Sequence, residues 1–212
     1  MTTAALPQNL SPFLRVSKHR MEALSDGVFA IVMTLLVLEL KVPDLPRTVS
    51  SGELGRALAH EGPVFFSFVI TFMFASLFWY LHHVLLNFLK EFPRKLIVVN
   101  LAFLLFVSLL PFSVGIQGHF LRNPFGQTIY FVNQLALATF LLVQWIIARR
   151  SSLLAEPDSR DSKIFGVRLT AIFLGTLLAI VFAWVTPTFS YYGFLFVMLA
   201  SRAYTTRKYG RY

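Results

Sequence analysis

The sequence contains no cysteine, and only 14% of its 212 residues are charged. Without cysteine, disulfides and thiolate metal sites are excluded. Soluble domains have about one quarter charged residues, whereas here 56% of the residues are hydrophobic. Much of the surface must therefore face something other than water. The first dozen residues lack a basic stretch followed by an apolar core, so we expect no cleaved signal peptide.

Uncharged runs are long and regularly placed. The runs 63–81, 96–118 and 123–148 can each span a bilayer as one helix. The run 169–201 is too long for one crossing, and Pro187 disfavours helical geometry in the residue before it, so we predict two helices there. With the opening segment, the chain is predicted to be one all-α domain, 1–212, of six transmembrane helices at about 20–41, 63–89, 95–117, 124–149, 164–185 and 188–205.

The polar connections indicate topology. The segment after the first helix contains Ser50-x-x-Glu53, a capping-box pattern that predicts a short surface helix. Six helices place both termini on one side, and only Lys41, Arg47, Arg56 and Arg122 among the 19 basic residues fall on the other. The positive-inside rule then predicts a multi-pass membrane protein with both termini in the cytoplasm. The excess of positive charge thus indicates orientation in the bilayer, and we expect no nucleic-acid partner.

The first hydrophobic segment is unusually short. Asp26 and Glu39 bracket the uncharged residues 27–38, which cover about 18 Å as a helix, whereas the hydrocarbon core is about 30 Å thick. Ionisable residues within a membrane usually face a bundle interior or a water-filled cavity. We therefore expect this helix to be enclosed by the other five or by other subunits, with water at both ends.

One face of this helix is distinctive. Ile31, Thr34, Leu35 and Leu38 follow i, i+3, i+4, i+7 spacing and share a face. Such a stripe could line an ion pathway, or it could be packed core. Gly27, Ala30 and Thr34 are small, as expected where helices approach closely. Asp26 could belong to an intramembrane site, or it could be an interfacial acid paired with Arg20 or a cap.

The same segment carries a family motif. Arg20, then LSDGVFAI at 24–31, TLL at 34–36 and Leu38-Glu39 closely resemble the signature of the transmembrane protein 175 (TMEM175) family. Trp79-x-x-His82-His83, Asn100 and Leu110-Pro111-Phe112 continue the resemblance, which covers nearly the whole chain. Leu24 departs from the family's Phe-Ser-Asp triplet, so whatever packing that aromatic ring provides is not carried over.

The resemblance implies a potassium-selective channel that lacks a T-V-G-Y-G filter or re-entrant loop. Single-repeat members of the family look like homotetramers, so the implied partners are further copies of this chain, the lipid bilayer and permeant potassium ions, with no cofactor. By position, Ile31, Leu35 and Leu38 of helix one would form apolar rings around a central pore and gate it by dewetting. Thr34 would add a ring of hydroxyls. Glu39 would be an outer-mouth acid that concentrates cations, or else a surface salt bridge, for example to Lys41.

A polar network is implied next to this helix. Ser25 and Asp26 need partners in a low-dielectric bundle, and Arg20, His82, His83 and Asn100 are the candidates. The histidine pair does not favour a metal site, because adjacent helical residues point about 100° apart.

Other classes of function remain open at this point. A secondary transporter would typically show internal repeats and broken helices, and an intramembrane enzyme would need a nucleophile and a base converging on a cleft. Neither pattern is visible, so we expect no enzyme. An ion-coupled secondary transporter and a non-conducting membrane scaffold stay as the alternatives to a channel.

Overall fold

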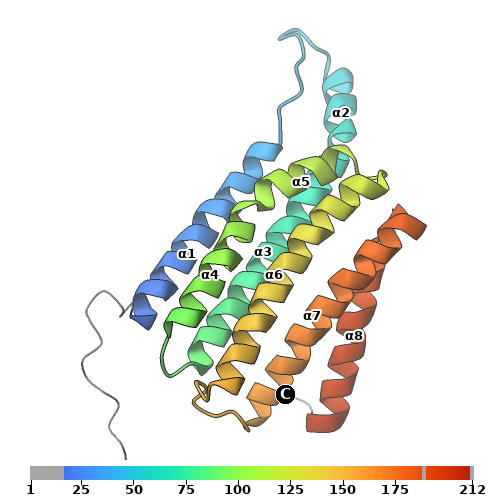
Figure 1. The fold of residues 1–212 in the computed structure, drawn as a ribbon. Helices are drawn as coiled ribbons and strands as arrows, with labels where there is room; N and C mark the ends of the chain where they lie inside the picture. Colours follow the sequence, from blue (N-terminus) through green and yellow to red (C-terminus); the bar gives the residue numbers. More distant parts are fainter. Residues whose placement is uncertain (1–16, 188–189, 211–212) are drawn as a thin grey trace, which may run out of the picture.

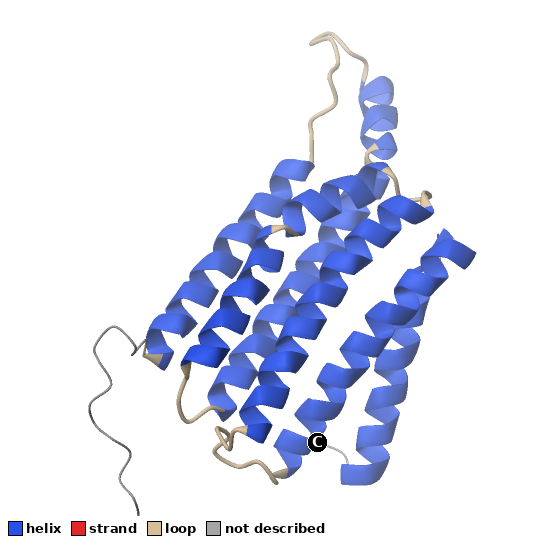
Figure 2. Cartoon of the chain, in the orientation of Figure 1, coloured by secondary structure: helices blue, strands red, loops and turns tan. Residues whose placement is uncertain are grey.

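The computed structural model describes residues 17–187 and 190–210, and within these ranges the regular structure is helical (Figures 1 and 2). The predicted all-α class is confirmed for this part of the chain. The elements are α1 (Lys18–Leu35), the 3-10 helix η2 (Leu36–Glu39), α2 (Ser51–His60), α3 (Gly62–Phe88), α4 (Arg94–Ser108), α5 (Leu110–His119), α6 (Pro124–Arg150), α7 (Arg160–Val185) and α8 (Ser190–Tyr209).

Five spans are long and apolar enough to cross a membrane: Lys18–Glu39, Gly62–Phe88, Arg94–His119, Pro124–Arg150 and Arg160–Val185. The sixth predicted membrane helix is present as α8, but it is not among these candidates. Residues 188 and 189, with which it was predicted to begin, lie outside the described residues. The count of six spanning helices therefore stays a prediction.

The first span gains its length from charged residues at its ends. Ser17 caps α1, because its side chain accepts a hydrogen bond from the backbone N–H of Arg20. The helix continues past Thr34 and tightens into η2, which ends at Glu39. The helical span from Lys18 to Glu39 is 22 residues long, or about 33 Å. The backbone is thus long enough to cross a bilayer, although its uncharged part is not.

The third predicted helix is divided in two. The range 95–117 was predicted as one helix, but α4 ends at Ser108 and α5 begins at Leu110. Pro111 lies in the first turn of α5. Proline has no N–H to donate to the preceding turn and disfavours helical geometry in the residue before it. As a result α5 runs at an angle to α4 (Figure 1).

The core of the chain does not surround α1. The buried cluster centres on large side chains of α3, α4 and α6, among them Phe78, Phe103 and Leu137. The α1 helix packs on α3, α4 and α5, while α7 and α8 pair at the opposite edge of the bundle (Figure 1). The expectation that the other five helices enclose α1 is therefore wrong for a single chain.

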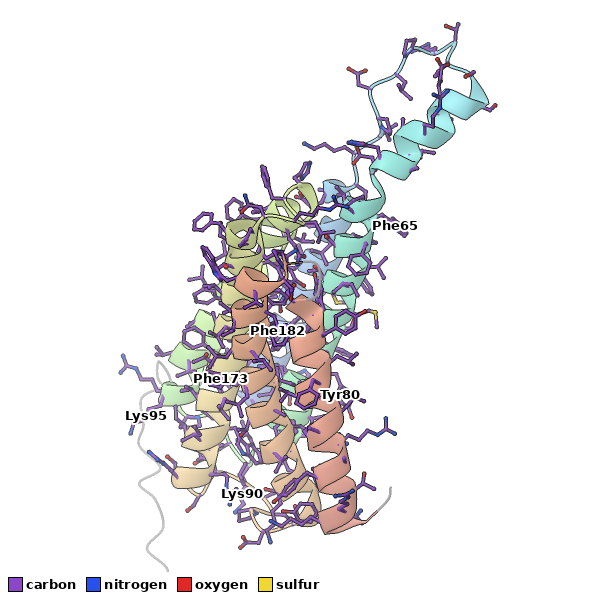
Figure 3. The ribbon with its side chains drawn as sticks, turned by 90° about the vertical axis from the view of Figure 1, so that its right-hand side faces the viewer. Phe65, Tyr80, Lys90, Lys95, Phe173 and Phe182 are labelled. Carbon is purple, nitrogen blue, oxygen red and sulfur yellow. The ribbon has the colours of Figure 1, made fainter. Side chains whose placement is uncertain are left out.

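The two ends of the bundle differ in charge. Beyond one end lies α2, joined to α1 by an extended loop (Figure 1). Lys90 and Lys95 lie near the opposite end, whereas Phe65 lies close to α2 (Figure 3). The loops 89–93 and 151–159 also lie at the end opposite α2 (Figure 1). The basic residues at the flanking helix ends, Arg94, Arg150 and Arg160, therefore lie at this end of the bundle, whereas the charged residues of the 151–159 loop itself are acidic, Glu156 and Asp158.

Candidate pore face and its polar support

The two faces of α1 have different surroundings. Met21, Ser25, Phe29, Val32 and Leu36 are buried against the bundle. On the opposite face Ile31 is 61% exposed, Leu35 42% and Leu38 67%, and Thr34 is exposed as well. The predicted stripe is thus outside the core of the chain. Within a single chain the stripe is therefore not packed against the core.

Small residues extend this open face. A methyl group added to Gly27 would meet nothing within 4 Å, and Ala30 is exposed. The close helix approach expected at these positions is therefore not made within the chain. Leu24 is 44% exposed, so the leucine that replaces the family's phenylalanine lies outside the buried core.

Thr34 has its hydroxyl proton already engaged. Its Oγ1 donates to the backbone carbonyl of Ile31, one turn earlier, at 2.7 Å. The remaining lone pairs of this oxygen are then available to accept from water or to face a cation. The stripe thus carries one hydroxyl oxygen between apolar side chains.

A buried chain of hydrogen bonds fixes the opposite face of α1. The Asn100 side chain in α4 donates through Nδ2 to the Ser25 hydroxyl at 3.2 Å, and its Oδ1 is paired with His82 Nε2 of α3 at 2.7 Å. All three side chains are at most 1% exposed. His82 also stacks on Phe103 with an interplanar angle of 9°. These hydrogen bonds therefore connect α1, α3 and α4 at the same depth in the bundle.

Asp26 does not take part in this series of hydrogen bonds. Its carboxylate is exposed and accepts a hydrogen bond from the Trp79 indole of α3 at 2.9 Å. His83 stacks beside the same indole and pairs with Asn87. The structure thus divides the predicted network into a buried part and an exposed part. The partner of Asp26, Trp79, was not among the predicted candidates.

Arg20 joins neither part. Its backbone N–H bonds to the Ser17 side chain, and the residue is exposed. Within residues 17–187 and 190–210, no hydrogen bond or ion pair connects its guanidinium to Ser25 or Asp26.

Glu39 lies at the α2 end of α1. It is half-buried, and its carboxylate lies so close to Gly115 of α5 that a side chain at position 115 would collide with it. Glu22 lies within ion-pair distance of Lys18 and His19, whereas no ion pair joins Glu39 to Lys41 in the described part of the chain. The same residues include no group of three His, Asp or Glu side chains that could hold a metal ion.

Sequence reasoning missed a second set of buried polar residues. Gln127, Tyr130, Asn133, Gln134 and Gln144 are all buried on α6. The uncharged run 123–148 was treated only as a membrane span, because amides do not interrupt a run defined by charge. Their signal was the spacing: residues 127, 130 and 134 are three and four positions apart and therefore share one face of the helix.

These features define a class. The chain is a membrane protein whose regular structure, over the residues described, is helical. Its motif-bearing first helix presents an apolar face outward, and a buried Ser–Asn–His chain of hydrogen bonds holds the opposite face. Residues 20–111 match the sequence model of the endosomal/lysosomal potassium channel TMEM175 family. The resemblance to this family is therefore confirmed for that segment.

Individual relatives agree with this assignment. A protein of Streptomyces collinus named a potassium channel is 28% identical, over 86% of this chain and 95% of its own length. A Chryseobacterium potassium channel is 35% identical over 51% of this chain and 54% of its own length. The human endosomal/lysosomal proton channel TMEM175 is 39% identical over 51% of this chain, but only 23% of the human protein is covered.

Solved structures show the same fold. A lysosomal potassium-selective channel TMEM175 homologue from Chamaesiphon minutus superposes with a TM-score of 0.70 at 23% identity, covering 89% of this chain and 97% of that one. A variant of the potassium channel MtTMEM175, bound to a nanobody fusion, gives a TM-score of 0.64 at 17% identity over 94% of this chain and 99% of that one.

Proposed function

We propose that the chain forms a potassium-selective channel of the cell membrane, with passive conduction along a pore shared by four copies. The single observation that carries this proposal is the exposed stripe of α1, Ile31, Thr34, Leu35 and Leu38. The names of the relatives support the permeant ion.

The apolar rings are the proposed gate. Four copies of Ile31, Leu35 and Leu38 around one axis would form a narrow neck that disfavours water and hydrated ions until it widens. Thr34 lies between the rings with its proton donated to Ile31, so its oxygen would face a partly dehydrated cation. No T-V-G-Y-G segment occurs in the sequence, and selectivity would then depend on α1 alone.

The polar residues have supporting roles in this proposal. The Ser25–Asn100–His82 chain holds the rear of α1, and the Asp26–Trp79–His83 group holds its exposed side. Arg20 would act near the cytoplasmic end as a basic anchor. Four copies of Glu39 at the outer mouth would raise the local cation concentration. With both termini cytoplasmic, the basic end of the bundle faces the cytoplasm.

Flux from liposomes tests the function. Purified protein in vesicles under a potassium gradient should dissipate an imposed potential passively and faster in potassium than in sodium. A transporter would instead require a coupled ion or solute, and a scaffold would give the same flux as empty vesicles. Either of these results would reject the channel.

A further inference from the structure

A groove lies between α3, α7 and α8, at the end of the bundle opposite α2. It has a volume of about 1010 Å³, which is as large as the larger ligand sites of proteins. Its lining comes from the second half of α3, the first half of α7 and the second half of α8. Because α7 and α8 form the edge of the bundle away from α1 (Figure 1), the groove is separate from the candidate pore face.

Three polar side chains of the groove lie at one depth. Tyr80 of α3, Arg168 of α7 and Arg202 of α8 are each seven or eight residues from the end of their helix at this end of the bundle, or about 11 Å. All three are exposed, and Figure 3 looks onto this side of the bundle with Tyr80 labelled. Arg168 and Arg202 also bracket the uncharged run 169–201. They therefore lie at the predicted boundary of the hydrocarbon core, where the headgroup region of the lipid begins.

Deeper in the membrane the lining of the groove is apolar. Leu77, Ile172 and Met198 lie three or four residues further along their helices than the three polar side chains, which is one helical turn. They are buried or half-buried. A molecule that fills the groove therefore meets two guanidinium groups at the boundary of the hydrocarbon core and an apolar wall inside it.

The charge of the lining favours an anion at the arginine level. Arg168 and Arg202 each carry a positive charge, and Asp161, two turns nearer the helix end, carries the one negative charge among the lining residues. Arg168 and Asp161 also take part in interactions within the chain, but a guanidinium has five N–H donors and binds phosphate oxygens in pairs. The Ser201 and Thr205 hydroxyls donate to backbone carbonyls of α8, so the two arginines are the principal donors for an anion.

We propose that this groove binds an anionic phospholipid, with its phosphate at Arg168 and Arg202 and an acyl chain along Leu77, Ile172 and Met198. Basic pockets between transmembrane helices are typical sites for anionic lipid headgroups. A soluble anion would contact the arginines and leave the apolar wall uncovered, and a zwitterionic lipid would bring an ammonium group close to both guanidinium groups. The proposal does not depend on potassium conduction.

Native mass spectrometry of the purified, delipidated protein tests the preference for charge. The protein is titrated with phosphatidylglycerol and with phosphatidylcholine of the same acyl chains. Phosphatidylglycerol should bind severalfold more tightly, and inorganic phosphate at the same concentration should not displace it. Equal binding of the two lipids would overturn the proposal, and so would displacement by inorganic phosphate, which would identify a site for a soluble anion.

A pair of double variants assigns this preference to the groove. Arg168→Gln with Arg202→Gln should weaken the binding of phosphatidylglycerol about tenfold, because charge-assisted hydrogen bonds to its phosphate are lost, and should leave phosphatidylcholine unchanged. Arg149→Gln with Arg150→Gln is the matched control, since it removes the same charge at the same end of the bundle from exposed residues of α6 outside the groove. Equal weakening by both pairs would reject the site in favour of general attraction to the basic end.

Photolabelling locates the lipid in the unmodified protein and decides the matter if the arginine variants do not fold. A phosphatidylglycerol with a diazirine in one acyl chain should label peptides that contain Leu77, Ile172 or Met198, and an excess of unlabelled phosphatidylglycerol should remove that label. Label confined to other helices would overturn the proposal. A groove filled by another copy of the chain would likewise leave these peptides unlabelled.

Discussion

At the scale of single residues, the role of a side chain follows from which face of its helix it occupies. Ser25 and Asp26 are adjacent in the family motif, yet Ser25 is fully buried against Asn100 and Asp26 is exposed beside Trp79. The resemblance implied one network of six residues: Arg20, Ser25, Asp26, His82, His83 and Asn100. It could not predict the division from Asp26, because which residues lie behind α1 depends on the packing of α3 and α4.

Asn100 is the residue on which this packing depends most. Asn100→Leu leaves the buried Ser25 hydroxyl and His82 without their partners, so we expect unfolding in detergent to become easier by roughly 2–4 kcal/mol. Asn87→Leu is the control, because Asn87 is exposed and bonds only to exposed His83. Equal stability of the two variants would show that the Ser25–Asn100–His82 hydrogen bonds contribute little to the free energy of unfolding.

The proposed gate can be tested by substituting Ile31. Ile31→Asn should increase potassium flux severalfold, because a polar ring holds water in a neck that isoleucine keeps dry. Ile31→Val shortens the side chain but keeps it apolar, so its flux should stay near the wild-type value. Unchanged or lower flux in well-folded Ile31→Asn would remove Ile31 from the constriction.

At the scale of helices, proline and capping residues decide the boundaries. Pro187 disfavours helical geometry in Thr186, and α7 indeed ends at Val185. The same rule applied to Pro111 would have divided the third predicted helix, but hydropathy alone gave one continuous span. Hydropathy indicates which segment of the chain can lie in lipid. It does not show where a helix breaks within that segment, which here is decided by the missing N–H of Pro111 in a single turn.

The surface helix α2 offers a prediction in pH. The hydrogen bonds from Ser50 hold the pKa of Glu53 below its ordinary value of 4.5. The carboxylate form therefore stabilises α2 above that value, and this contribution is lost as the pH falls through the lowered pKa. In Ser50→Ala the pKa of Glu53, followed by NMR, should rise towards 4.5. A Glu53 pKa that does not change would show that the capping box has no electrostatic effect.

At the scale of the whole molecule, the distribution of charge predicts the orientation. Ser51 in α2 and Ser152 in the 151–159 loop lie at opposite ends of the bundle and are both exposed. The absence of native cysteine makes single-cysteine labelling free of background. An impermeant maleimide should label Ser51→Cys in intact cells and Ser152→Cys only after lysis. The reverse pattern would invert the proposed topology.

The assembly is the part of the account that one chain cannot specify from its sequence. The spacing of Ile31, Thr34, Leu35 and Leu38 predicted a common face, but a periodic stripe is the same whether it meets a core, a pore or lipid. The structure shows that the stripe does not face the core of its own chain. The symmetry of the proposed tetramer would depend on complementary surfaces of several helices, which no local pattern encodes.

The central claim is that the outward face of α1 borders a hydrated axis shared by several copies of the chain. A structure of the assembled protein in a lipid nanodisc is its most direct measurement. We predict four copies with Ile31, Thr34, Leu35 and Leu38 turned towards one central axis. Acyl chains packed against Ile31 and Leu35 at the perimeter of the assembly would contradict the account.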